Sequence, residues 1–144
     1  MISLLDIPAR LALGVIFMSH GCRKLFGWFG GRDYQDIPPI LEKLGAHNVR
    51  LLLRSVGALQ WISGFLVFCG LWTCWGAGFI AAEVLLGIAL TQLPNGLFLN
   101  WKSVPGRQHG MEYNLAIIAL TLPLICAGAG PWSLDFARAM GIVP

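Results

Sequence analysis

The amino-acid sequence predicts an all-α integral membrane protein, a four-helix bundle with a short amphipathic helix between its first and second transmembrane helices. Of its 144 residues, 56% are hydrophobic and only 12% are charged, whereas soluble domains average about 25% charged residues. Eighteen glycines and six tryptophans agree, because glycine is common in membrane helices and tryptophan gathers at membrane interfaces. The length suits one domain, so residues 1–144 are expected to form a single transmembrane unit.

The first helix is expected at residues 8–28. The first nine residues contain one charged residue, Asp6, and no Lys or Arg. No small-residue cleavage site follows the apolar run. The apolar run is therefore interpreted as a membrane helix and not as a signal peptide. Its cleanly apolar part, residues 11–19, covers only about half a bilayer, so a spanning helix must carry charged residues toward both of its ends.

The next apolar stretch, residues 55–101, contains only one charged residue, Glu83, and is too long for a single span of roughly 20 residues. The glycine- and tryptophan-rich sequence CGLWTCWGAG (69–78) predicts a turn between two helices. The Pro-Asn-Gly sequence at 94–96 predicts the end of the second of them. The three remaining membrane helices are therefore expected at residues 51–72, 76–97 and 112–129.

The main polar segment, residues 30–50, separates the first two membrane helices. Within it, DIPPILEKLGAH (36–47) predicts a short amphipathic helix, with prolines at its start, Leu41 and Leu44 on one side and Gly45 at its end. We expect this helix to lie along the membrane surface.

Lys and Arg are distributed unequally between the two sides of the predicted bundle. Six of the ten belong to the first-to-second and third-to-fourth connections, and Arg23 and Lys24 lie on the same side. Only Arg10 and Arg138 lie on the opposite side. The positive-inside rule places these two connections in the cytoplasm and both termini outside.

Several polar side chains fall at membrane depth. Arg10, His20 and Lys24 share one face of the first helix, with Gly14 and Gly21 between them. Glycines allow another helix to approach closely, so this face is expected to point into the bundle. A charge at the bilayer centre costs at least about 2.5–3.5 kcal/mol, so these groups need partners or water. The polar residues of the other helices are Gln60, Glu83, Gln92 and Glu112.

Two interpretations of these residues stay open. Arg10 and Glu83 are expected at similar depths on the same side, which favours an intramembrane ion pair. Lys24 and Glu112 can extend their charges to the interface, and His20 can be a neutral imidazole bonded to a helix carbonyl. The functional alternative is a polar site near the cytoplasmic end, where His20 and Lys24 bind an anionic or carbonyl-bearing ligand.

The four cysteines have neither C-x-x-C spacing nor a Cys/His metal spacing. They are interpreted as small apolar residues packed within helices. Cys69 and Cys74 flank a turn that is predicted to lie outside, where disulfides are permitted, so a bridge between them is the alternative.

The sequence R-x3-G-x2-F-x2-H-G-x2-K-L-x-G (10–27), followed by WFGG (28–31), resembles the first helix of the DoxX-like membrane proteins. The resemblance continues through LPNGLF (93–98), GMEYNLA (110–116) and GPWSLD (130–135), in the same order. It implies a four-helix bundle of the cytoplasmic membrane. Some members are small subunits of quinone-linked oxidoreductases, of the thiosulfate:quinone or quinol oxidase type.

Four positions depart from the pattern of that family. Its second helix usually carries a glutamate followed by paired glycines, where this chain has Gln60 and Ser63. A histidine commonly precedes the LPNG element, where this chain has Gln92. Glu83 is not a family feature, and one interpretation is that it replaces the acid missing at position 60.

The resemblance supports a first hypothesis, a membrane subunit associated with a quinone-linked oxidoreductase. It would contribute a polar pocket near the cytoplasmic leaflet, formed by His20, Lys24, Gln92 and Glu112. No haem, flavin or iron–sulfur motif is present, so we expect no covalently bound cofactor, with quinone or lipid as the bound molecule. Without a catalytic motif of its own, the chain would be at most one subunit of an enzyme.

The second hypothesis is a non-catalytic accessory subunit that stabilises a larger membrane protein complex. Both hypotheses predict membrane lipids and other subunits as partners, and neither predicts nucleic acid. A third hypothesis, a permeation pathway through an Arg10–Glu83 layer, is weakened by the absence of an evident inverted repeat.

Overall fold

The computed structural model describes residues 6–29, 46–98, 100 and 110–142, and all regular secondary structure in these ranges is helical. The all-helical class predicted from the sequence is confirmed for these residues. The amphipathic helix predicted at 36–47 lies almost wholly outside them. The helices are α1 (Asp6–Phe26), α3 (Ala46–Cys69), α4 (Thr73–Gly87) with its π-helical continuation η2 (Ile88–Gln92) and 3-10 turn η3 (Leu93–Asn95), α5 (Glu112–Ala127) and α6 (Leu134–Ala139).

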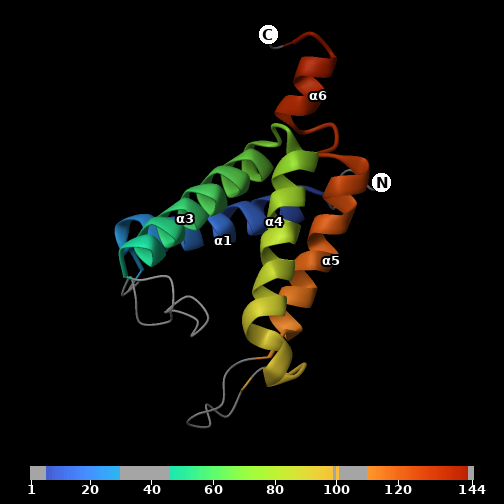
Figure 1. Ribbon diagram of the computed structural model, residues 1–144. Helices are drawn as coiled ribbons and strands as arrows, with labels where there is room; N and C mark the ends of the chain where they lie inside the picture. Colours follow the sequence, from blue (N-terminus) through green and yellow to red (C-terminus); the bar gives the residue numbers. More distant parts are fainter. Residues whose placement is uncertain (1–5, 30–45, 99, 101–109, 143–144) are drawn as a thin grey trace.

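The four long helices are arranged as two antiparallel pairs (Figure 1). α1 runs beside α3, and α4 runs beside α5. The two pairs are inclined to each other, so that they meet near the turn between α3 and α4 and diverge away from it. In place of an evenly packed bundle, the chain therefore has two inclined hairpins.

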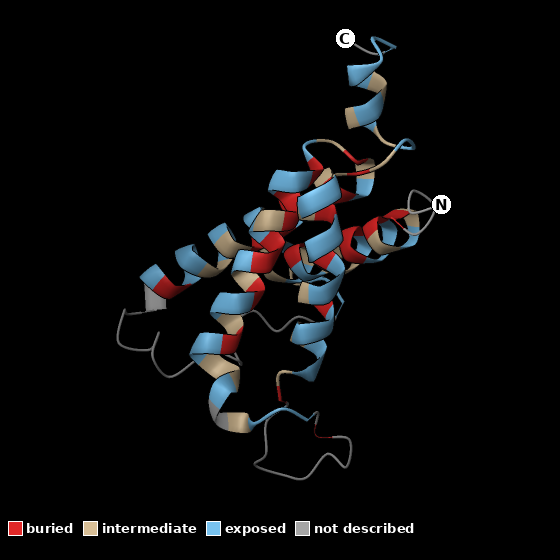
Figure 2. Cartoon of the chain, turned by 90° about the vertical axis from the view of Figure 1, so that its right-hand side faces the viewer, coloured by how far each residue is buried: buried red, intermediate tan, exposed pale blue. Residues whose placement is uncertain are grey.

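Two of the described segments, Asn48–Cys69 and Thr73–Gln92, are long and apolar enough to cross a bilayer, with 22 and 20 residues. Only 28% and 33% of their most apolar windows are buried within the protein. Figure 2 shows that the buried residues follow the faces where helices meet, while the outward faces are exposed. Leucine, phenylalanine and tryptophan side chains are prominent on these exposed faces, so the outer surface requires an apolar surrounding such as lipid.

The packing of α1 on α3 depends on glycines in both helices. Gly14 and Gly21 of α1 face Gly64 and Gly57 of α3. A methyl group added at Gly21 would lie 2.7 Å from the Gly57 carbonyl oxygen, and one at Gly64 would lie 2.8 Å from the Met18 nitrogen. The two helices therefore meet backbone to backbone, as small residues permit. The prediction that Gly14 and Gly21 admit a neighbouring helix is confirmed.

Arg10 joins the ends of two other helices to the start of α1. Its side chain, which is only 5% exposed, donates hydrogen bonds to the carbonyl oxygens of Val67 at 3.2 Å and Phe68 at 3.3 Å, near the end of α3. It also donates to the carbonyl oxygens of Ala129 at 2.9 Å and Trp132 at 2.8 Å, just after α5. The last carbonyl groups of a helix lack intrahelical partners and favour a cation, so one guanidinium holds these chain ends together.

Asp135 closes the same end of the molecule from the C-terminal segment. Its carboxylate oxygens accept hydrogen bonds from the backbone N–H groups of Trp72 at 2.7 Å and Thr73 at 2.9 Å. Its own N–H donates to the Gly70 carbonyl oxygen at 2.8 Å. A carboxylate at a helix N-terminus is stabilising because it satisfies unpaired N–H groups and opposes the helix dipole. The start of α4 is thus capped by a residue more than sixty positions later in the chain.

The opposite end of α4 is joined to the start of α5 by backbone hydrogen bonds. The N–H groups of residues 110–112 donate to the carbonyl oxygens of residues 96–98 over distances of 2.9–3.2 Å. A methyl group at Gly110 would lie 2.5 Å from the Phe98 carbonyl oxygen, so only glycine fits this close approach. The LPNGLF and GMEYNLA segments therefore act together to hold the second hairpin.

Replacing Gly21 by Val is expected to force α1 away from α3 and to destabilise the protein by about 1–3 kcal/mol, as overpacking does. Thermal unfolding of the purified protein in detergent measures the effect. Gly78→Val on α4 is the matched control, because nothing lies within 4 Å of a Cβ added there. Equal unfolding temperatures for the two variants would contradict the glycine contact.

Replacing Arg10 by Met is expected to lower the free energy of unfolding by about 3 kcal/mol, because buried carbonyl groups lose a charged donor. Arg10→Lys should recover part of this loss, since an ammonium group also donates but in a different geometry. Arg138→Met, at an exposed position of α6, is the control. A stability of Arg10→Met equal to that of Arg138→Met would rule out the role assigned to Arg10.

Candidate functional site

A pocket of about 210 Å³ is lined by residues of α1, α3, α4 and α5. It contains polar side chains from all four helices, although each helix is otherwise largely apolar. Apolar side chains, including Phe17, Val84 and Ile117, form the rest of the lining, which is called the apolar floor below. The polar lining residues are His20 and Lys24 of α1, Gln60 of α3, Glu83 of α4, and Tyr113 and Asn114 of α5.

The charged pair of this pocket is Lys24 and Glu83. The Lys24 Nζ lies 3.9 Å from the Glu83 Oε1, and the two side chains are 31% and 15% exposed. This distance allows electrostatic attraction but is too long for a hydrogen bond. The two charged groups therefore attract each other, but no hydrogen bond forms between the Lys24 Nζ and the Glu83 Oε1.

The wall formed by α3 and α4 contains two buried oxygen atoms without hydrogen-bond donors. Within the described residues, neither the Gln60 Oε1 nor the Glu83 Oε2 has a partner, and the Gln60 residue is only 7% exposed. A buried acceptor without a donor costs about 1–3 kcal/mol. This wall is therefore suited to a molecule that brings a hydrogen-bond donor.

The ion pair predicted between Arg10 and Glu83 is wrong. Arg10 binds carbonyl groups beside the turn that precedes α4, whereas Glu83 lies ten residues into that helix, about 15 Å along its axis. Because α1 crosses α4 at an inclination, Lys24 is the cation that reaches Glu83.

The four residues predicted to form a pocket are only partly brought together. His20 and Lys24 line it, and Gln92 lies next to it, since its Oε1 accepts a hydrogen bond from the Asn114 Nδ2 at 2.6 Å. Glu112 does not line the pocket. It is the first residue of α5, and the helical turn directs positions 113, 114 and 117 inward instead.

Tyr113 and Asn114 are the pocket residues that the sequence-based prediction missed. They follow Glu112 directly, and together with the apolar residue at 117 they have the i, i+1, i+4 spacing of an inward helix face. That spacing was the available signal. The roles of all these residues in ligand binding remain predictions.

The end of α4 widens beside this site. Residues 88–92 form a π-helix, in which the Thr91 hydroxyl donates to the Gly87 carbonyl oxygen at 2.7 Å. The Asn95 amide donates to the Thr91 carbonyl oxygen at 2.9 Å. Single π-helical turns occur frequently at functional sites, and this one places Gln92 against Asn114.

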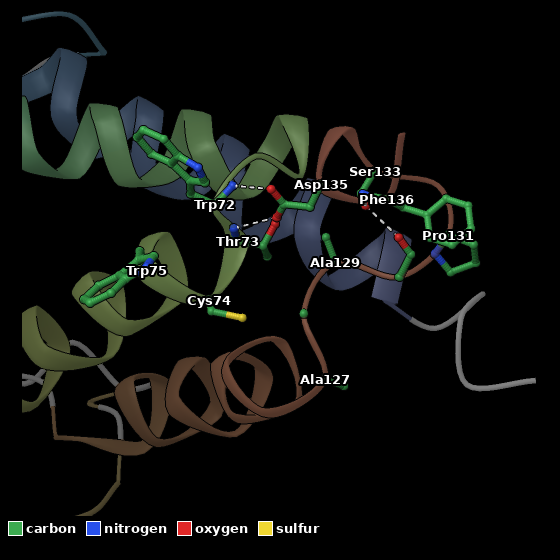
Figure 3. A pocket seen from close by; sticks show the side chains of 12 residues that line it. Trp72, Thr73, Cys74, Trp75, Ala127, Ala129, Pro131, Ser133, Asp135 and Phe136 are labelled. Carbon is green, nitrogen blue, oxygen red and sulfur yellow. Dashed lines mark hydrogen bonds between the residues drawn. The ribbon is translucent and has the colours of Figure 1, made fainter. Parts of the chain in front are cut away.

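A larger hollow of about 510 Å³ lies at the opposite end, between the start of α4 and the segment after α5 (Figure 3). Its walls include Trp72, Trp75 and Phe136. The carboxylate of Asp135 faces it but is already occupied by the two N–H groups of the α4 start, as the dashed lines in Figure 3 show. The main polar group of this hollow is therefore already used to cap the start of α4. The smaller pocket is the better candidate site.

The cysteines are all free thiols. The interpretation that they are buried is wrong for Cys74 and Cys126, which are exposed, while Cys22 and Cys69 are half-buried. The alternative bridge between Cys69 and Cys74 is not formed. Among the residues that the structure describes, no group of three His, Cys, Asp or Glu side chains is placed to hold a metal ion.

Comparison with known proteins places this chain in a family. The DoxX family model matches residues 5–93. The uncharacterized membrane protein Rv3486 of Mycobacterium tuberculosis is 29% identical over 135 residues, which cover 90% of this chain and 78% of that protein. No solved structure matches. Because the family model covers more than half of the chain and the relative is itself a membrane protein, this protein is a membrane protein of the DoxX family.

Proposed function

We propose that this protein is a small membrane subunit that binds a quinone between its two inclined hairpins and serves a quinone-linked oxidoreductase of the thiosulfate:quinone or quinol oxidase type. The observation that carries the proposal is the pocket in which His20, Lys24, Gln60 and Glu83 surround an apolar floor. A quinone head group has oxygen atoms at opposite edges of a flat apolar ring. Polar groups from facing helices around an apolar floor suit that shape.

The volume of the pocket suits a ligand head group with a single ring. Pockets for drug-sized ligands are about 300–1,000 Å³, and this one is about 210 Å³. A head group of one ring would fill it, while an isoprenoid tail would extend past the exposed apolar faces into lipid. Lys24 and His20 supply donors for a ring oxygen.

The site also fits an arrangement in the cytoplasmic membrane with both termini outside. Arg10 and Asp135 gather the start of α1, the α3–α4 turn and the segment after α5 at one end. The pocket lies further along the helices, toward the connections that carry most of the Lys and Arg residues. The proposed quinone site therefore faces the cytoplasmic leaflet.

A second function, an accessory subunit of a larger membrane complex, is favoured by one observation. On α3, beside its contact with α1, the rings of Trp61 and Phe65 stack with centroids 5.5 Å apart and an interplanar angle of 4°. Both residues are exposed, and stacked aromatic side chains offer a flat surface for another membrane helix.

Purification in mild detergent separates the two functions. Co-purification of a redox partner in fixed ratio supports the first function, and co-purification of a partner of another kind supports the second.

Replacing Gly87 by Leu is expected to fill the pocket and to weaken quinone binding at least about tenfold, a loss of about 1.4 kcal/mol. Gly87 lines the pocket, and nothing lies within 4 Å of a Cβ added there, so the larger side chain is accommodated without displacing the backbone. Binding is measured by calorimetric titration of the purified protein with a short-chain benzoquinone.

Gly78→Leu is the matched control for this variant, because Gly78 lies on the same helix, has equally open surroundings and does not line the pocket. Unchanged binding in Gly78→Leu and weakened binding in Gly87→Leu would support the site. Unchanged binding in both variants would remove the pocket from consideration.

A reporter enzyme that is active only in the cytoplasm is expected to be inactive when it is fused after residue 144, because the positive-inside rule places the C-terminus outside. A reporter that is active only outside the cytoplasm, fused at the same position, is the control. An active cytoplasmic fusion would reverse the proposed orientation.

A further inference from the structure

We infer that the pocket selects the reduced, hydroxyl-bearing form of its ligand, and that Gln60 and Glu83 are the residues that determine this specificity. The inference rests on the proposed quinone site and adds to it a preference for one redox form. It concerns binding alone.

The basis is the wall where α3 faces α4. The Gln60 Oε1 and the Glu83 Oε2 are both buried, both belong to residues that line the pocket, and neither has a donor within the described residues. The Lys24 Nζ lies 3.9 Å from the Glu83 Oε1, and the Oε2 has no donor within the described residues. The wall therefore presents acceptor atoms in excess of donors.

The two redox forms of a quinone differ in what they offer to such a wall. The carbonyl oxygen of the oxidised form only accepts hydrogen bonds, so against an acceptor wall it would leave both partners unsatisfied. Each hydroxyl of the reduced form donates one hydrogen bond. The terminal torsions of Gln and Glu are broad and roughly two-fold, so either side chain can turn an oxygen toward a hydroxyl without leaving a favoured rotamer.

Glu83 is the stronger of the two acceptors when its carboxyl group is ionised. A hydrogen bond from a hydroxyl to a carboxylate is shorter and about twice as strong as one between neutral groups. The Lys24 ammonium, with its Nζ 3.9 Å from the Glu83 Oε1, is the nearest opposite charge to this carboxyl group. Elsewhere in the pocket, the Tyr113 hydroxyl and the His20 imidazole each donate and accept and therefore do not discriminate, whereas the Lys24 ammonium only donates and is already paired with Glu83.

The test uses the full-length protein in detergent, titrated without oxygen with a short-chain benzoquinone and, separately, with the corresponding hydroquinone. Wild-type protein is expected to bind the hydroquinone about tenfold more tightly, which is the scale of one satisfied buried hydrogen bond. Equal affinities, or tighter binding of the oxidised form, would overturn the inference.

Substitutions at the wall test which atoms are responsible. Glu83→Gln exchanges one acceptor oxygen for a donor amide, so the preference for the hydroquinone is expected to fall to near unity or to reverse while the benzoquinone still binds. Gln60→Leu removes the second acceptor and should reduce hydroquinone affinity alone, which keeps the test decisive if Glu83→Gln does not fold. Glu112→Gln, the same exchange outside the pocket, should leave the preference unchanged.

The outcomes separate this inference from the proposed function. If neither form binds, or if Gly87→Leu leaves the binding of both unchanged, the quinone site itself is wrong. If both forms bind equally and Gly87→Leu weakens both, the quinone site stands and the inference about redox selectivity fails. If the preference persists in both Glu83→Gln and Gln60→Leu, the acceptor wall does not determine it.

Discussion

The guanidinium of Arg10 is the interaction on which the arrangement of the helices depends. By donating to carbonyl groups at the end of α3 and after α5, it joins the first hairpin to the second at a single end of the molecule. Asp135 adds the start of α4 to the same junction. Because the two hairpins are tied at this end and inclined to each other, they separate along their length (Figure 1), and the polar pocket lies between them.

The glycine contact between α1 and α3 makes the first hairpin closely packed. At Gly14 and Gly21 the backbones of the two helices approach so closely that an added methyl group would clash. His20, Lys24 and Gln60 lie on these two closely packed helices and line the pocket that residues of α4 and α5 complete.

The residues that carry the family resemblance and those that depart from it have different uses. Arg10, the LPNGLF and GMEYNLA segments, and Asp135 of GPWSLD mainly satisfy the ends of helices, a need that every membrane helix has because lipid supplies no hydrogen bonds. Gln60 and Glu83, which depart from the family pattern, lie together in the pocket. Within one fold, the shared residues maintain the structure, and the divergent ones are those from which we infer ligand preference.

The sequence alone determined the helical class, the membrane setting and the glycine contact, because apolar length, low charge and seven-residue glycine spacing are local properties of the chain. It also identified His20 and Lys24 as residues of an inward face. Only the tertiary structure decided that Arg10 binds helix ends, that Lys24 is the partner of Glu83, and that Tyr113 and Asn114 complete the pocket in place of Glu112. Depth along one helix can be counted from residue spacing, but the inclination between two hairpins is set by packing far apart in the chain, and that inclination determines which polar groups meet.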